Sequence, residues 1–219
     1  MIDVIMPTYL PEQKNFDFFC ESVNSLKQQT FKDFNTKVVF NGPNDFRSQV
    51  EKLVLDDDRF QFMYIGDKAS GAIARNYGIK HSSSKYIAQL DADDLYHEDK
   101  LQQQFDFMEE NDWCGFLATC VWVMRNGGLV PSTGTDPFQT HAQITTRLPL
   151  ENIVCHGSVM FRRSHTFGKD IFYNEEKKPG VNNWFEDWDL WLRFVDAGVK
   201  FHKLSKSLYY WREGSSVGR

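Results

Sequence analysis

The chain has 219 residues, a formal net charge of -5 and a sequence pI near 5.7. This length is enough for one domain with a substantial core, without a need for a second domain. The acidic balance argues against nucleic acid as the main partner, and no apolar run approaches the ~20 residues of a membrane-spanning helix.

The first half of the chain alternates short apolar runs with helical patterns. Strands are predicted at Ile2 to Met6, Lys37 to Phe40, Phe60 to Ile65 and Tyr86 to Leu90. Helices are predicted between them, at about Phe16 to Leu26, Phe46 to Leu55 and Ala72 to His81. Because parallel strands need a crossover, which helices supply, this alternation predicts a mostly parallel α/β sheet of a nucleotide-binding type.

The second half of the chain has a different pattern. A helix is predicted at about His97 to Glu110, a hairpin over Gly115 to Val130 with its turn at Asn126-Gly127-Gly128, and a strand over Asn152 to Phe161. Loops are predicted over Pro131 to His141 and Lys169 to Asn183. The end of the chain is predicted to form a helix over Trp184 to Val195, capped by Asn182 or Asn183, and one or two short strands over Phe201 to Trp211.

Three carboxylates, Asp91, Asp93 and Asp94, follow the strand at Tyr86 to Leu90. Like charges crowded at a strand end are costly unless a cation lies there, and Mg²⁺ and Mn²⁺ take one or two carboxylates together with substrate phosphates. Ligands of an open α/β sheet bind outside the carboxyl ends of its strands, which is where these acids lie. An Asp-rich turn that only caps the next helix is the alternative.

A second acidic pair, Glu186-Asp187, comes late in the chain. If both acidic sites lie together, the first holds metal and phosphates, and the second takes a proton from an attacking alcohol. Acids in the first turn of a helix are also favoured by the helix dipole without any function. These residues alone leave both interpretations open.

Five segments in order resemble family 2 glycosyltransferases with the GT-A fold, over nearly the whole chain. They are Met6–Tyr9, Gly71–Gly78, Tyr86–Asp94, His156–Arg162 and Glu186–Arg193. The resemblance implies a Rossmann-like, mostly parallel central sheet flanked by helices, with a smaller mixed β region on the acceptor side. It also implies one GT-A domain over residues 1–219, in which residues 1–94 bind the nucleotide sugar and residues 95–219 bind the acceptor.

The resemblance assigns a role to each candidate site residue. Donor contacts are implied for Pro7, Thr8, Tyr9, Asn41, Arg75, Asp91, Ala92 and Asp93. Among them, Thr8 and Tyr9 line the base and ribose, and the guanidinium of Arg75 suits the base or diphosphate. Asp91 contacts ribose or sugar hydroxyls, and Asp93, in the DXD motif, binds Mn²⁺ or Mg²⁺.

Acceptor contacts are implied for His156, Gly157, Trp184 and Glu186, and Asp187 is implied to be the general base, which gives inversion at the anomeric carbon. A structural role for His156 is an equal alternative. The helical spacing of Trp184, Trp188 and Trp191 favours the core over a sugar platform.

Two segments depart from the family pattern. Phe40-Asn41-Gly42-Pro43 stands where Asp-Asp or Asp-Asn before Gly-Ser is common, so Asn41 offers an amide to the base, and uracil is not specified. Tyr210 to Ser215 lacks the His that completes the metal site in many members. Water, a phosphate oxygen or Glu213 is expected at that position.

The sequence therefore predicts a metal-dependent inverting glycosyltransferase that moves a sugar from a nucleotide-sugar donor to a hydroxyl acceptor, in glycan or surface polysaccharide synthesis. Four cysteines without C-x-x-C spacing and the absence of a signal-like apolar start favour a cytoplasmic location. The alternatives are a non-catalytic nucleotide-sugar or glycan-binding module and a DNA-base glycosyltransferase. A nucleotidyltransferase of similar fold is a further alternative, but this sequence has no Gly-rich phosphate loop after its first strand, which argues against it.

Overall fold

The computed structural model describes residues 1–66, 69–132, 138–176 and 185–214. The strands are β1 Ile2–Thr8, β2 Phe34–Phe40, β3 Phe60–Tyr64, β4 Tyr86–Gln89, β5 Leu95–Tyr96, β6 Phe116–Arg125, β7 Gly128–Pro131, β8 Met160–Arg162 and β9 Phe201–Arg212. The α-helices are α1 Gln13–Lys27, α2 Arg47–Val54, α3 Gly71–Lys80, α4 Lys100–Glu110, α5 His141–Arg147 and α6 Glu186–Asp196. Single 3₁₀ turns are η1 Asn44–Phe46, η2 His156–Ser158, η3 Arg163–His165 and η4 Phe167–Lys169.

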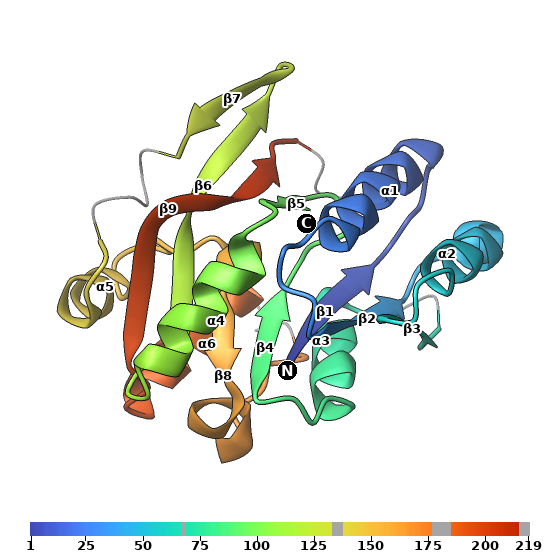
Figure 1. The fold of residues 1–219 in the computed structure, drawn as a ribbon. Helices are drawn as coiled ribbons and strands as arrows, with labels where there is room; N and C mark the ends of the chain where they lie inside the picture. Colours follow the sequence, from blue (N-terminus) through green and yellow to red (C-terminus); the bar gives the residue numbers. More distant parts are fainter. Residues whose placement is uncertain (67–68, 133–137, 177–184, 215–219) are drawn as a thin grey trace.

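The strands form one sheet in the order β3-β2-β1-β4-β8-β6-β9-β5, and β7 pairs with β6 (Figure 1). β3, β2, β1 and β4 are parallel to one another, as the alternation of strands and helices predicts. β8 then pairs antiparallel with β4, and the strands beyond it form a mixed region. The expected α/β fold, with a parallel first half and a mixed β region, is confirmed.

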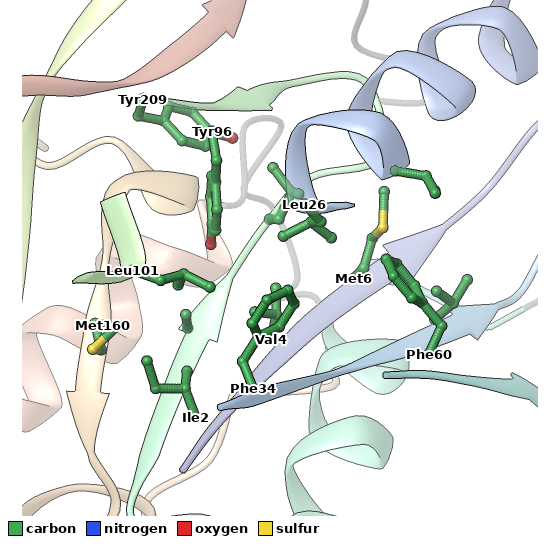
Figure 2. Packing of buried hydrophobic residues seen from close by; sticks show 14 of the residues in the cluster. Ile2, Val4, Met6, Leu26, Phe34, Phe60, Tyr96, Leu101, Met160 and Tyr209 are labelled. Atoms are coloured by element: carbon green, nitrogen blue, oxygen red, sulfur yellow. The ribbon is translucent and has the colours of Figure 1, made fainter. Parts of the chain in front are cut away.

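Helices cover both faces of the sheet because its central strands are apolar on both sides. In β1, Ile2, Val4 and Met6 point to the face covered by α1, α2 and α4 (Figure 2), and Ile5 points to the face covered by α3, α5 and α6. Each side chain of this type contributes ~1.5–3 kcal/mol when fully buried. Within the described residues, no helix has the length and apolar character needed to cross a membrane.

The expected strand over Asn152 to Phe161 is wrong in its first part. His156–Ser158 forms the turn η2, closed by Ser158 N donating to the carbonyl of Cys155 at 3.1 Å, and only Met160–Arg162 is strand. The turn brings Gly157 against Tyr209 of β9, where a Cβ would lie 1.9 Å from the tyrosine oxygen. Buried apolar residues, Ile153 and Val154 before the turn and Val159 and Met160 after it, give the whole segment the composition of a buried strand.

Three further expectations differ from the structure or fall outside the part that it describes. The final predicted strands are one strand, β9, and the two residues of β5 pair with it. The helix α5 is absent from the sequence-based expectations, although Thr140 and Gln143 form a capping box at its start. Two expected loops lie partly outside the described residues, namely Pro131 to His141 and Lys169 to Asn183. The expected caps Asn182 and Asn183 lie wholly outside them.

We expect Gly157→Ala to lower the free energy of unfolding by ~1–3 kcal/mol, because the methyl group has to displace the buried ring of Tyr209. Urea unfolding measures the change. Gly128→Ala in the exposed strand β7 is the control, since its Cβ would have its nearest neighbour 3.7 Å away. Equal stability of the two variants would contradict the packing of Gly157 against Tyr209.

Candidate active site

The turn that follows β4 is held from two sides. Ser22 of α1 donates its hydroxyl to the carbonyls of Ala92, at 3.0 Å, and of Asp94. Arg212, the last residue of β9, donates its Nε to the carbonyl of Asp93 at 2.8 Å. The backbone of the turn is therefore fixed at the carboxyl end of β4, where ligands of a parallel sheet bind.

Asp94 differs from the other two acids of the turn. It is buried, and its carboxylate accepts hydrogen bonds of 2.6 Å from the Tyr209 hydroxyl and the Arg212 backbone N–H. Burial raises the pKa of Asp94 well above its ordinary value, and the charges of Asp93 and Asp91 raise it further. Asp94 thus joins the turn to β9, while Asp91 and Asp93 remain partly exposed.

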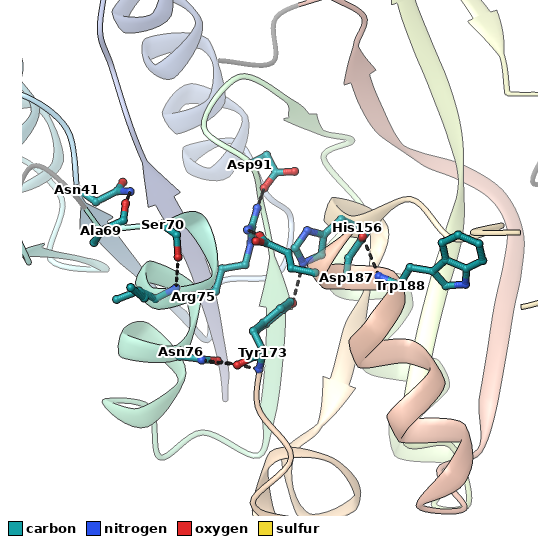
Figure 3. A network of polar contacts seen from close by, with 12 residues as sticks. Asn41, Ala69, Ser70, Arg75, Asn76, Asp91, His156, Tyr173, Asp187 and Trp188 are labelled. Atoms are coloured by element: carbon teal, nitrogen blue, oxygen red, sulfur yellow. Dashed lines mark hydrogen bonds and ion pairs between the residues drawn. The ribbon is translucent and has the colours of Figure 1, made fainter. Parts of the chain in front are cut away.

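Arg75 of α3 joins the two acidic sites. Its Nη2 donates to Asp91 at 2.7 Å (Figure 3). Its Nη1 donates to Glu186 at the start of α6. The Arg75 side chain is 10% exposed. Burial lowers the pKa of Arg75, but the charges of Asp91 and Glu186 more than offset this and hold it above its ordinary value. Both acidic sites therefore lie against one guanidinium, as one shared site requires.

The start of α3 is shaped around this arginine. Ser70 caps the helix by accepting the N–H of Ile73, and a Cβ at Gly71 would lie 2.8 Å from Arg75 Nη1. The next residue, Asn76, is buried and exchanges bonds of 2.8 and 2.9 Å with the backbone of Tyr173. The segment Gly71–Gly78 thus lets the guanidinium of Arg75 pack against the Gly71 backbone, and it links α3 to the second half of the chain through Asn76.

His156 is part of this polar network. Its Nε2 and the hydroxyl of Tyr173 share a hydrogen bond of 2.6 Å. Burial lowers the pKa of His156 to about 4, and the charge of Arg75 acts in the same direction. Burial raises the pKa of Tyr173 well above its ordinary value. His156 is therefore neutral and a weak base at neutral pH.

Asp187 lies at the first turn of α6, half-buried, next to Glu186. Its Oδ1 accepts the backbone N–H of Trp188 at 2.8 Å (Figure 3). Its Oδ2 accepts the amide of Asn152 at 3.0 Å. These bonds fix the carboxylate at the amino end of the helix, where the dipole favours a negative charge.

The tryptophans of α6 serve the core. Trp191 is fully buried, and Trp188 donates its indole N–H to the carbonyl of Leu148 at 2.7 Å. These two positions agree with the core interpretation of their helical spacing. Trp184 lies outside the described residues.

The other expected donor residues, apart from Arg75 and the turn after β4, lie at the carboxyl ends of β1 and β2. Pro7 and Thr8 end β1, and Thr8 is buried with its hydroxyl donating to the carbonyl of Met6 at 3.0 Å. Tyr9 is 43% exposed. Asn41 is 4% exposed and donates its amide to the carbonyl of Ala69 at 2.7 Å. Its Oδ1 has no hydrogen-bond partner among the described residues.

The residues of the turn fit a divalent ion that relies on its substrate for ligands. No group of three or more His, Cys, Asp or Glu within the described ranges is arranged to hold a metal. Asp91 and Asp93 offer carboxylate oxygens, which suit Mg²⁺ or Mn²⁺ when phosphates complete the shell. The carboxylate of Glu213 is paired with Arg125.

Sequence reasoning missed several partners of these site residues, among them Ser22, Asn152, Tyr173, Tyr209 and Arg212. Each is far in sequence from the residue it contacts. None belongs to the five segments, so their polar character was the sole signal. Tertiary structure alone brings them to the site.

Comparisons with known proteins identify the family of the chain. The family model "Glycosyl transferase family 2" matches residues 3–167. The O-antigen biosynthesis glycosyltransferase WbnJ of Escherichia coli is 26% identical over 217 residues, which cover 97% of this chain and 79% of that protein. Three similar Rickettsia glycosyltransferases are much longer, and the chain spans 25% to 29% of each.

Solved structures share the fold. The structure of S. aureus TarS 1–349 in complex with UDP-GlcNAc is similar with a TM-score of 0.75 and 21% identity, over 99% of this chain and 59% of that chain. The mannosyltransferase PcManGT from Pyrobaculum calidifontis, in complex with GDP-Man and Mn²⁺, is similar with a TM-score of 0.65 and 15% identity, over 95% of this chain and 56% of that chain. The family model covers more than half of the sequence, and the chain belongs to glycosyl transferase family 2.

Proposed function

We propose that this chain catalyses metal-dependent, inverting transfer of a sugar from a nucleotide-sugar donor to a hydroxyl acceptor. The observation that carries the proposal is the shared contact of Arg75 with Asp91 and Glu186. This contact keeps the acids after β4 close to the start of α6, so a donor and a base have a common site. Residues 1–94 contribute the donor side, and residues 95–219 contribute the acceptor side.

In the proposed reaction, Asp187 accepts the proton of the acceptor hydroxyl. The acceptor oxygen forms a bond to the anomeric carbon from the face opposite the diphosphate, and the bond to the diphosphate oxygen breaks. A nucleoside diphosphate leaves, and the sugar configuration inverts. Asp187 suits this role because its hydrogen bonds hold it in place, whereas His156 is a weak base bound to Tyr173.

Asp93, with Asp91 beside it, would hold Mn²⁺ or Mg²⁺, which when bound neutralises charge on the departing diphosphate. The direct contact of Arg75 with the donor also stays a proposal, and its two Nη atoms already bond carboxylates. Pro7, Thr8, Tyr9 and Ala92 remain proposed donor contacts, and His156, Gly157, Trp184 and Glu186 remain proposed acceptor contacts. The relation to WbnJ supports glycan synthesis as the process.

Asn41 offers the donor base a hydrogen-bond acceptor. Because its amide N–H₂ is bound to Ala69, its buried Oδ1 is left to accept a hydrogen bond. The ring N–H of uracil or guanine donates to such an oxygen, and so does the exocyclic amino group of cytosine or adenine, so Asn41 alone does not select the base. We propose a uridine or guanosine diphosphate sugar as the donor because the two structural neighbours hold UDP-GlcNAc and GDP-Man.

Two isosteric variants separate the proposed roles of the acids. Asp187→Asn is expected to retain metal-dependent donor binding and to lose ~10²–10⁴ in transfer rate, because it removes the base. Asp93→Asn is expected to lose metal-dependent donor binding. Calorimetry and product release in single turnovers measure the two effects.

The controls are Asp189→Asn, in the same turn of α6 and paired with Arg193, and Asp99→Asn before α4. Both are expected to resemble the unchanged protein. Full transfer by Asp187→Asn would refute the base assignment, and unchanged metal-dependent affinity of Asp93→Asn would refute the metal assignment.

The burial of His156 predicts how the stability of the protein depends on pH. In the unfolded chain His156 takes up a proton near pH 6.5, while the folded protein keeps it neutral down to about pH 4. The unfolded state therefore binds more protons in this window, and stability falls as the pH decreases from 6.5 towards 4. NMR of the imidazole should show a midpoint near 4, and His156→Gln should reduce the loss of stability. A midpoint near 6.5 would contradict the burial of this ring.

A further inference from the structure

Arg212 makes the polar contact that fixes the middle of the metal-side turn. Its Nε donates to the carbonyl of Asp93 at 2.8 Å, and its own backbone N–H donates to Asp94. Ser22 holds the carbonyls of Ala92 and Asp94 on either side. The three carbonyls after Asp91 thus all accept side-chain hydrogen bonds.

The guanidinium of Arg212, at the end of β9, is itself anchored on α1. Its Nη2 donates to Glu21, and its Cζ lies 3.9 Å from the ring centre of Phe18. The side chain is 17% exposed. Because the planar guanidinium donates to the Asp93 carbonyl and to Glu21 at once, its orientation is fixed; a lysine ammonium has no such planar geometry.

Backbone position sets the direction of a side chain. If the carbonyl of Asp93 were released, its carboxylate would sample more orientations, and ordering it around an ion would cost conformational entropy. Groups that orient a ligand residue affect metal affinity without touching the metal.

We propose that Arg212 is a positioning residue that holds the carbonyl of Asp93, and thereby orients the Asp93 carboxylate toward a divalent ion bound with the donor diphosphate. The proposal rests on the proposed function. It assigns a role at the donor site to the end of β9 and to Glu21 and Phe18 of α1, which lie outside the five motif segments.

The test is calorimetry of UDP and GDP binding with and without Mn²⁺, together with the electron paramagnetic resonance signal of free Mn²⁺. We expect Arg212→Ala to weaken Mn²⁺-dependent binding by ~10–100-fold, as loss of an outer-shell contact typically does. Binding without Mn²⁺ should be unchanged. The side chain lines a cavity of about 320 Å³ together with Lys14 and Phe18, so its truncation leaves the apolar core intact.

Three further variants distinguish position from charge. Arg212→Lys keeps the charge and is expected not to restore affinity, because one ammonium does not replace the fork. Glu21→Gln removes the anchor and should give a smaller loss in the same direction. Arg147→Ala, which removes the exposed pair with Glu151, is the control and should change nothing.

Unchanged Mn²⁺-dependent affinity in Arg212→Ala would overturn the inference, and so would full restoration by Arg212→Lys. An equal loss with and without Mn²⁺ would overturn it too, since the whole donor site would then be affected. If the unchanged protein bound neither nucleotide in the presence of Mn²⁺, the proposed function itself would fail.

Discussion

The site depends on one guanidinium that two carboxylates share. Arg75 is buried on α3, and without Asp91 and Glu186 its charge would lack compensation. The two acids repel each other, so each also needs the arginine. Breaking a buried ion pair leaves an unpaired charge and is more costly than the pair's net contribution suggests. The two halves of the chain are therefore held together at the point where the proposed chemistry takes place.

Three aspartates of one turn have different environments. Asp94 is buried and bound on both sides by β9, whereas Asp91 faces Arg75 and Asp93 sits between the two carbonyls that Ser22 holds. Burial favours the protonated form of a carboxyl group, and ion pairing favours the charged form. A buried structural acid thus lies in one turn with two acids that are partly exposed at the site.

The parts of the fold that were predictable are those with a local signal. The apolar runs of β1 and β4 and the periodic face of α1 are readable because burial on a sheet or helix repeats along the chain. The acids at Asp91–Asp94 and Glu186-Asp187 were readable because charged residues are rare next to buried strands and follow a family pattern.

The rest of the site depends on contacts between distant segments. The segment around the η2 turn resembles a strand in sequence because buried apolar residues flank the turn, and only Tyr209, brought in by β9, shows why Gly157 is required. Likewise, nothing near Tyr173 or Arg212 in the sequence predicts that they bind His156 and the carbonyl of Asp93. Such partners follow from the tertiary fold, which sequence patterns do not specify.

The most direct test of the account is a thermal-shift panel of nucleoside diphosphates and nucleotide sugars, each with and without Mn²⁺, because a ligand that binds only the folded state raises its melting temperature. The account predicts a shift that requires the metal for a uridine or guanosine nucleotide. The absence of a metal-dependent shift with every member of the panel would contradict it and favour a degenerate site.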